Sequence, residues 1–193
     1  MGIISRFPAG ATKPYIEEIY NSDGQLIDAK MYGHEAIRDN AFYYCTNLAL
    51  TSLPSGITNI GNSAFSGCTN LALTSLPSGI TSIDVGAFYN CTNLALTSLP
   101  SGITSIGNRV FSECTSFALT SLPSGITNIG DYAFAGCSSL VSLTFEGTPE
   151  NIGASAFAGC NNLTTINVPW AEGAVANAPW GAENATINYG HTG

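Results

Sequence analysis

A period of 23 residues runs through most of this chain. The cysteines and a set of phenylalanines recur at that spacing: Cys45, Cys68, Cys91, Cys114, Cys137 and Cys160, with Phe42, Phe65, Phe88, Phe111, Phe134 and Phe157. Repeats with a period of about 20 to 50 residues are typical of solenoids, in which each unit packs only on its neighbours. The sequence therefore predicts an elongated stack of similar coils rather than a globule built around one central core.

Each repeat has two halves, as the unit at residues 61–83 shows. The first half, with the residue just before it, places Ile60, Phe65 and Cys68 at the spacing of one face of a short helical segment. The second half, around residues 71–76, reads as a strand that ends in a proline. We therefore predict a solenoid with a parallel β-sheet on one face and short helical or 3-10 turns on the opposite, convex face.

A glycine opens the convex segment of most repeats. It stands at four positions, Gly61, Gly107, Gly130 and Gly153, and Asp84 replaces it in another copy. Aspartate tolerates the left-handed backbone better than most residues do. We therefore expect a positive φ at this position, and a negative φ at Gly61 would contradict the expectation.

We divide the chain into three parts: residues 1–32, a lead-in and β-hairpin cap; residues 33–169, the repeats; and residues 170–193, a C-terminal cap. Two strand-like segments flank Asp23 and Gly24, a pair that favours a tight hairpin turn. Such a hairpin would cover the apolar end of the first coil. Residues 1–14 are expected to be irregular. At the other end, both tryptophans are expected to cover the last coil.

We interpret the cysteine column as buried free thiols. Successive coils lie about 4.8 Å apart, a distance that falls inside the Cα separation of a disulfide. Parallel side chains give poor S–S geometry, however, so we expect the cysteines to act as small apolar residues. A column of single cysteines also does not converge on a tetrahedral centre, so we expect no metal site.

Composition argues against two classes of partner. Only 9% of the residues are charged, and the formal net charge is −8. The five cationic side chains do not cluster: Arg6, Lys13, Lys30, Arg38 and Arg109. Nucleic-acid binding requires a basic surface, so we expect no nucleic-acid partner. No apolar run approaches the roughly 18 residues of a membrane span, and no secretory signal is visible at the start.

No group of side chains assembles a reaction centre in the sequence. His34 lies beside Glu35, but this pair lacks a nucleophile and an orienting partner. The glycines recur in every unit, so they indicate turns rather than a phosphate-binding loop. We therefore predict a protein that is not an enzyme, with no catalytic residues and no cofactor.

The repeats resemble the BspA-type leucine-rich repeats of bacterial surface proteins. The resemblance rests on the motif Ile-Gly-x-x-Ala-Phe-x-x-Cys-x-x-Leu followed by a strand that ends in proline, and it covers residues 37–169. It implies a right-handed leucine-rich repeat solenoid with a parallel sheet on one face. The last two strands follow the family pattern, with Leu140, Leu143 and Phe145 in the first of them. The four earlier strands instead read Leu-Ala-Leu-Thr-Ser-Leu, with small changes.

This departure leaves two arrangements open for the earlier strands. If they keep the family register, their threonines point inward and one leucine of each strand points outward as a ladder. If a local bulge shifts the chain, the same leucines are buried. The candidate binding residues on this face are Leu50, Leu73, Leu96 and Leu119, with Ser52, Ser75, Ser98 and Ser121. An exposed leucine ladder is also an apolar stripe, which predicts association into homo-oligomers.

These features favour a recognition or adhesion module that binds a protein or a glycan through the strand face. The alternative is a structural spacer or a component of a phage tail, in which the two ends make the contacts. The SRFPAG segment near the start and the last section of the chain are similar to leucine-rich proteins encoded in prophages of gut Firmicutes. By these resemblances, the expected location is an extracellular surface or a virion.

Overall fold

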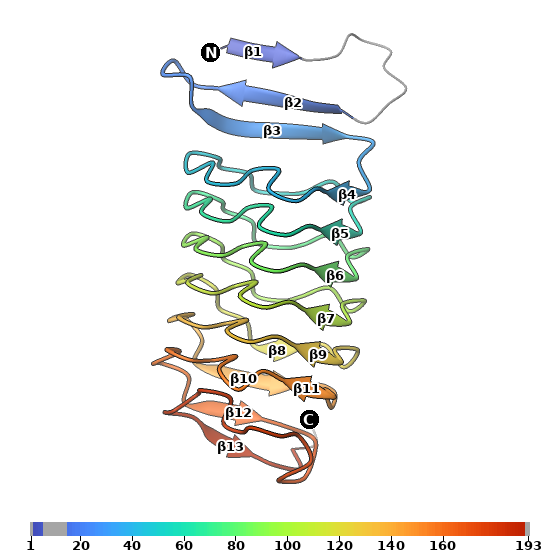
Figure 1. Cartoon of the computed structure of the whole chain (residues 1–193), viewed down its shortest axis with the longest axis vertical. Coiled ribbons are helices and arrows are strands. Elements are labelled where there is room, and N and C mark those ends of the chain that lie inside the picture. Colours follow the sequence, from blue (N-terminus) through green and yellow to red (C-terminus); the bar gives the residue numbers. More distant parts are fainter. Residues whose placement is uncertain (1, 6–14, 192–193) are drawn as a thin grey trace.

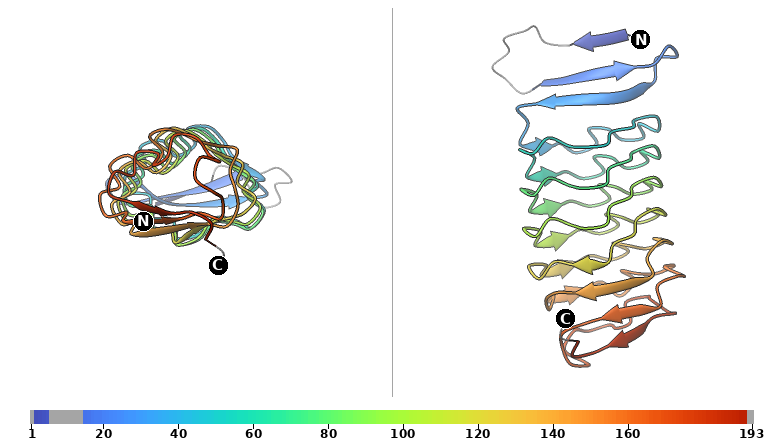
Figure 2. Two further views of the ribbon diagram at one scale, coloured as in Figure 1. Left: turned by 90° about the horizontal axis from the view of Figure 1, so that it is seen from below. Right: turned by 180° about the vertical axis from the view of Figure 1, so that it is seen from behind.

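The computed structural model describes residues 2–5 and 15–191, and over these residues it contains strands and turns but no helix. The coils stack along the long axis of the molecule, with the N-terminal strands at one end and β13 at the other (Figure 1). Seen along that axis, they superimpose on a common outline (Figure 2). The strands are β1 Gly2–Ser5, β2 Tyr15–Tyr20, β3 Leu26–Tyr32, β4 Ala36–Ile37, β5 Asn59–Ile60, β6 Ser82–Ile83, β7 Ser105–Ile106, β8 Ser121–Leu122, β9 Asn128–Ile129, β10 Ser142–Phe145, β11 Asn151–Ile152, β12 Thr165–Asn167 and β13 Thr186–Asn188.

We number the coils 1 to 6 by their phenylalanines, from Phe42 to Phe157. The turn segment is the predicted convex part of each coil, residues 61–68 in coil 2 and the equivalent residues elsewhere. The strand face is the surface formed by residues 71–77 and their equivalents.

One parallel sheet of short strands runs along the repeats, in the order β11-β9-β7-β6-β5-β4. Its register advances by one repeat at each step, so that Ile60 pairs with Ile83 and Ile83 with Ile106. The isoleucines of these strands point inward and are buried, whereas the neighbouring polar residues face outward. This alternation is typical of a sheet with one buried face.

The strand face carries a second parallel sheet, which is confined to the C-terminal half. Its order is β13-β12-β10-β8. In coils 1 to 3 the equivalent residues form no strand, and a single backbone bond such as Ala72 N to Leu50 O (3.1 Å) joins them to the preceding coil. The predicted sheet on this face is therefore present from coil 4 onward, and its first strand, β8, belongs to the last of the four strands that depart from the family pattern.

The turn segments are not helical, so the predicted helical or 3-10 turns are wrong. In coil 2, the amides of Ala64 and Cys68 donate to carbonyls three residues earlier, Gly61 O at 3.2 Å and Phe65 O at 3.0 Å. The intervening amide of Phe65 instead donates to Ala87 O of the next coil, at 2.8 Å. Because alternate amides are directed to the neighbouring coil, successive turns cannot merge into a helix with i to i−4 bonds.

The expected positive φ at the first glycine of the turn segment is also wrong. Gly61 lies outside the left-handed region, and the left-handed residues are Ser63 (φ 51°) and Gly67 (φ 75°). Gly61 is required for a different reason, which is close approach between coils. A Cβ atom there would lie 2.8 Å from Asp39 N and 3.0 Å from Arg38 C.

Phenylalanine rings form the centre of the core. The six rings from Phe42 to Phe157 stack on one another, with centroids of neighbouring rings 5.1 to 5.7 Å apart. Each is at most 2% exposed. The strict period therefore places one aromatic ring per coil at the same position in the stack.

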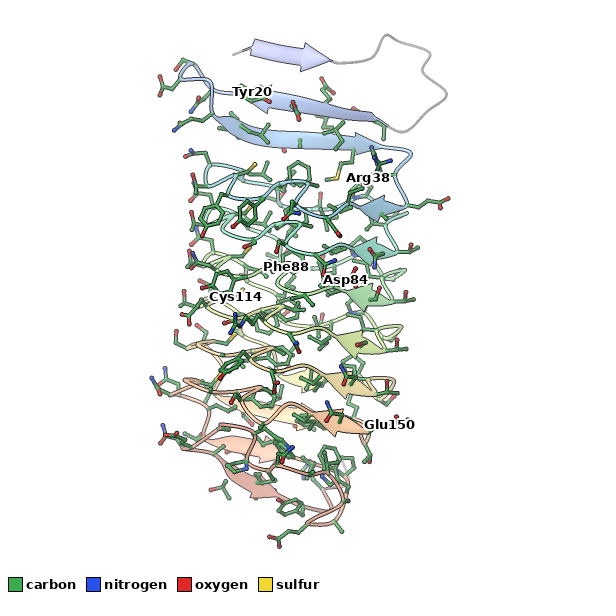
Figure 3. All side chains as sticks on the ribbon, in the orientation of Figure 1. Tyr20, Arg38, Asp84, Phe88, Cys114 and Glu150 are labelled. Carbon is green, nitrogen blue, oxygen red and sulfur yellow. The ribbon has the colours of Figure 1, made fainter. Side chains whose placement is uncertain are left out.

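The cysteines are free, as predicted, and five of the six are buried, whereas Cys45 is half-buried. Each buried thiol donates a hydrogen bond to the phenylalanine carbonyl of the preceding coil; Cys114 Sγ lies 3.1 Å from Phe88 O, a pair labelled in Figure 3. Burial raises the pKa of Cys68 and of Cys114 from 9.0 to about 12, and the pKa of Cys160 to about 11. These thiols therefore stay protonated in the folded protein at neutral pH.

The raised thiol pKa values predict that stability falls in alkali. Between about pH 9 and pH 12 the unfolded chain releases thiol protons that the folded chain retains, so the free energy of unfolding decreases as pH rises through this range. We expect the urea midpoint to fall between pH 8 and about pH 10.5. A Cys68→Ala/Cys114→Ala variant should start from a lower midpoint but show a shallower dependence on pH. Equal slopes for parent and variant would contradict this account.

The N-terminal end is closed by the expected hairpin. Strands β2 and β3 pair antiparallel around the Asp23–Gly24 turn, and Ala49 N donates to Ile27 O at 2.9 Å to join the hairpin to coil 1. The first strand, β1, pairs antiparallel with β2, so part of the segment expected to be irregular is a strand. Residues 1 and 6–14, which belong to the same expectation, lie outside the described residues.

The C-terminal end is covered by both tryptophans, which are buried. The Trp170 ring packs edge-on against Phe145 with centroids 5.2 Å apart, and Trp180 lies 6.3 Å from Trp170. Trp180 Nε1 donates to Ala176 O at 2.7 Å. The strand β13 then pairs with β12 and continues the sheet. The residue boundaries of the three parts of the chain stay a prediction.

Candidate binding surfaces

The leucines predicted as candidate binding residues are buried, so the exposed leucine ladder is wrong. Leu50, Leu73, Leu96 and Leu119 are at most 4% exposed. The alternative arrangement holds, because Leu71, Leu73 and Leu76 all point inward. Two consecutive residues then face outward between the second and third leucine, as at a bulge. The apolar stripe that suggested homo-oligomers is therefore not formed by these leucines.

The strand face instead presents pairs of hydroxyl side chains. In coils 1 to 3 a threonine and the following serine are both exposed, and in coil 4 the threonine is exposed and the serine half-buried. The pairs are Thr51 with Ser52, Thr74 with Ser75, Thr97 with Ser98, and Thr120 with Ser121. The predicted serines thus lie at the surface, and the threonines point outward rather than inward. The result is a row with one pair per coil, about 4.8 Å apart. The pairs of coils 1 to 3 are uncharged, whereas Ser121 of coil 4 donates to the Glu146 carboxylate at 2.8 Å.

A hollow lies at the N-terminal end of this row, between β3 and coil 1. It has a volume of about 390 Å³ and is lined by residues 28–32 of the hairpin and 49–54 of coil 1. Thr51 and Ser52 are among these lining residues. The first hydroxyl pair therefore lies in a concave site.

A second hollow lies on the turn segments, and sequence analysis did not identify it. It has a volume of about 490 Å³, and its larger lining residues are Tyr89, Arg109, Glu113 and Tyr132. These residues come from coils 3, 4 and 5. The available signal was the concentration of differences between copies at these positions, such as Asn108-Arg109 and Asp131-Tyr132, within otherwise uniform repeats.

The described residues contain no group of three or more side chains suited to hold a metal ion. His34 is half-buried, and its Nε2 atom has no hydrogen-bond partner among the described residues. No helix in the described part of the chain is long and apolar enough to cross a membrane.

A stack of parallel coils with one phenylalanine, one cysteine and several leucines buried per turn defines a leucine-rich repeat solenoid. The chain belongs to the BspA type leucine rich repeat family, whose model matches six copies over residues 35–164. The resemblance drawn from the repeat motif is thereby confirmed. A search among curated proteins finds no match.

Solved structures with similar folds come from several bacteria. The Leucine Rich Repeat protein TpLRR of T. pallidum is 29% identical, with a TM-score of 0.63 and 85% of each chain covered. A leucine-rich repeat protein from Bacteroides ovatus is 21% identical, with a TM-score of 0.56 over 83% of this chain and 47% of that one. The pneumococcal vaccine antigen PcpA is 20% identical, with a TM-score of 0.56 over 84% of this chain and 38% of PcpA. These likenesses agree with the solenoid fold.

Proposed function

We propose that the protein is a non-enzymatic recognition or adhesion module whose strand face binds a protein or a glycan. The observation that carries the proposal is the row of exposed, uncharged hydroxyl pairs in coils 1 to 3, which continues into coil 4. Membership of the BspA type leucine rich repeat family agrees with such a role, because its repeats resemble those of bacterial surface proteins. The expected location is accordingly an extracellular surface.

The chemistry of the row suits a ligand with a repeating unit. Each hydroxyl donates one hydrogen bond and accepts others, so a pair can bond to either a sugar hydroxyl or a peptide group. Equivalent pairs recur in each of coils 1 to 4, so an extended ligand contacts several of them in the same way. The buried leucines on both sides of each pair, such as Leu73 and Leu76, hold the backbone in place. A surface that is already ordered loses little conformational entropy on binding.

Substitution on the strand face is expected to abolish binding without unfolding the protein. Ser75 and Ser98 are exposed, so arginines at these positions should protrude into the row and block a ligand. We expect the parent to bind at least one target in a screen of bacterial cells, mucosal proteins and a glycan array. The Ser75→Arg/Ser98→Arg variant should bind that target with an affinity at least about tenfold lower.

The matched control is Ser78→Arg/Ser101→Arg. It introduces the same charges in the same two coils at exposed positions beyond the strand-face proline. Circular dichroism should show both variants folded. Equal binding by the parent and both variants, or no binding by the parent, would overturn the proposal.

The second candidate function is a structural spacer whose two ends make the contacts. The observation in its favour is that both ends carry elements outside the repeat, the β1–β3 sheet and the tryptophan-covered last coil. A spacer would tolerate arginines on the strand face and would lose its contacts when residues 1–32 are changed. A role in a phage particle rests only on the short terminal segments that resemble prophage proteins.

A further inference from the structure

We propose that the hollow on the turn segments of coils 3 to 5 is a binding site for a neutral oligosaccharide. We call it the tyrosine cleft, after Tyr89 and Tyr132, which line it together with Arg109, Ser112 and Glu113. Its volume of about 490 Å³ lies in the usual range of small-molecule sites. The cleft opens on a different segment of the coil from the strand face. Binding at the cleft can therefore be tested independently of the function proposed above.

Two partly exposed aromatic rings provide the first feature of a sugar-binding site. Tyr89 is 37% exposed and Tyr132 is 41% exposed, so part of each side chain remains accessible to a ligand. Arg109 lies over the Tyr132 ring, with its guanidinium carbon 5.3 Å from the ring centroid. A tyrosine ring offers a flat apolar face with a polar end. Such a face suits the C–H side of a sugar ring, which is itself apolar on its flat surface.

Charged groups of opposite sign provide the second feature, which is a set of hydrogen-bond donors and acceptors for sugar hydroxyls. Arg109 carries five N–H donors, and the Glu113 carboxylate is an acceptor. Within the described part of the chain, neither residue forms an ion pair. A donor fork and an acceptor in one cleft match neighbouring sugar hydroxyls, which both donate and accept. Because the two charges cancel, and because the whole chain carries a net charge of −8, a neutral sugar is favoured over an acidic one.

Small residues of the following coils leave room beside these side chains. The cleft is also lined by Ala135, Gly136, Ala158 and Gly159. Glu113 lies so close to Gly136 that a Cβ atom there would be 2.7 Å from the carboxylate oxygen Oε1. Ser112, at 5% exposure, also lines the cleft. The cleft is thus built from large side chains of coils 3 to 5 and small ones of coils 5 and 6.

The backbone supplies an independent reason to assign a function to these side chains. Arg109, Glu113 and Tyr132 all adopt left-handed backbone, with φ of 57°, 63° and 57°. A left-handed conformation is unfavourable for bulky residues and is tolerated by glycine and asparagine. At the equivalent positions coil 3 carries Gly86 and Asn90, whereas coil 1 carries Asn40 and the bulky Tyr44. Bulky side chains kept at positions that disfavour them are typical of functional sites.

The decisive experiment uses asparagine variants, since Asn40 and Asn90 adopt the same backbone conformation elsewhere in the stack. Arg109→Asn and Tyr132→Asn are therefore expected to fold with unchanged or higher melting temperatures. The matched control is Tyr44→Asn, which replaces an exposed tyrosine with φ of 56° outside the cleft. The probes are malto-, cello-, galacto- and N-acetylchito-oligosaccharides on an array, with uronic-acid and sialylated glycans beside them.

The full chain is expected to bind one class of neutral oligosaccharide on the array. In solution the Kd should weaken about tenfold or more in Arg109→Asn and in Tyr132→Asn, and should stay unchanged in Tyr44→Asn. In an NMR titration with the bound sugar, the Arg109 Nε–Hε resonance should shift. Ser75→Arg/Ser98→Arg should bind the sugar like the parent, which separates this cleft from the strand face. Absence of neutral-sugar binding, binding of acidic glycans only, or unchanged binding by both cleft variants would overturn the proposal.

Discussion

Replacing Phe111 with alanine is expected to lower the free energy of unfolding by about 3–5 kcal/mol. The Phe111 ring is fully buried and stacks on rings in both neighbouring coils, Phe88 at 5.7 Å and Phe134 at 5.6 Å between centroids. It also packs against Phe117 of its own coil at 4.6 Å. Truncation therefore leaves a cavity in the middle of the stack. Urea unfolding followed by circular dichroism measures the loss.

Two comparisons make this prediction specific. Phe111→Leu keeps most of the buried volume and should lose roughly 1.5 kcal/mol or less. Phe42→Ala should lose less than Phe111→Ala. Phe42 lies in coil 1, and among the described residues its ring stacks on the phenylalanine of one neighbouring coil, Phe65, instead of two. If Phe42→Ala proved as destabilising as Phe111→Ala, the stacked rings would not be the source of the effect.

Replacing Gly130 with alanine is expected to destabilise the protein by about 3 kcal/mol, although only one methyl group is added. A Cβ atom at Gly130 would lie 2.6 Å from Asn108 N and 2.7 Å from Gly107 C, and would also collide with Asn108 Oδ1. Relief of these clashes requires coils 4 and 5 to separate locally. The separation would break the bond from Gly130 N to Ile106 O, now 2.9 Å. It would also break the bond from Asp131 N to Asn108 Oδ1.

The control is Gly125→Ala, five residues away in the chain. Gly125 has ordinary backbone, and an added Cβ atom would meet only Ile103 O at 3.5 Å and Ser101 O at 3.6 Å. We expect this variant to unfold within about 0.5 kcal/mol of the parent. A loss of similar size in both variants would show that the effect comes from glycine itself and not from the close approach of the coils.

The repeat and its inward columns were predictable because the period imposes them. Residues 23 apart occupy the same environment, so one reading of Phe65 or Cys68 applies to every coil. The buried rings and thiols follow from that alone. The hairpin at Asp23 and Gly24 was predictable from turn chemistry, which is local.

Whether the Leu73 side chain points inward or outward was not predictable, because the same sequence is compatible with two strand registers. In the family register Thr74 would be buried and Leu73 exposed. The structure buries Leu73 and exposes Thr74 and Ser75, at the expense of the sheet in coils 1 to 3. Burial of a leucine is worth about 1.5–3 kcal/mol, whereas a hydrogen bond contributes about 0.5–1.5 kcal/mol net. Burial of the leucine therefore outweighs the hydrogen bonds of the sheet in these coils.

The turn segments and the tyrosine cleft were missed because neither is a local property of the chain. The spacing of Ile60, Phe65 and Cys68 resembles a helix face, but the amide of Phe65 is directed to Ala87 in the next coil. A local pattern contains no information about that partner. The cleft likewise joins Tyr89 and Tyr132, which lie 43 residues apart in the chain (132 − 89) and meet only because the coils stack.

The bonds between coils have a consequence for the length of the molecule. The thiol of Cys91 bonds to Phe65 O as that of Cys68 bonds to Phe42 O, and the Thr92 hydroxyl bonds to Thr69 O as that of Thr69 bonds to Thr46 O. A copy can therefore be removed or inserted, and the coils on either side meet through contacts of the same kind. Loss of residues 69–91 would shorten the stack by about 4.8 Å and leave both ends unchanged. Copy number thus sets how far the two ends stand apart, and homologous recombination between near-identical repeats can adjust that reach in single steps.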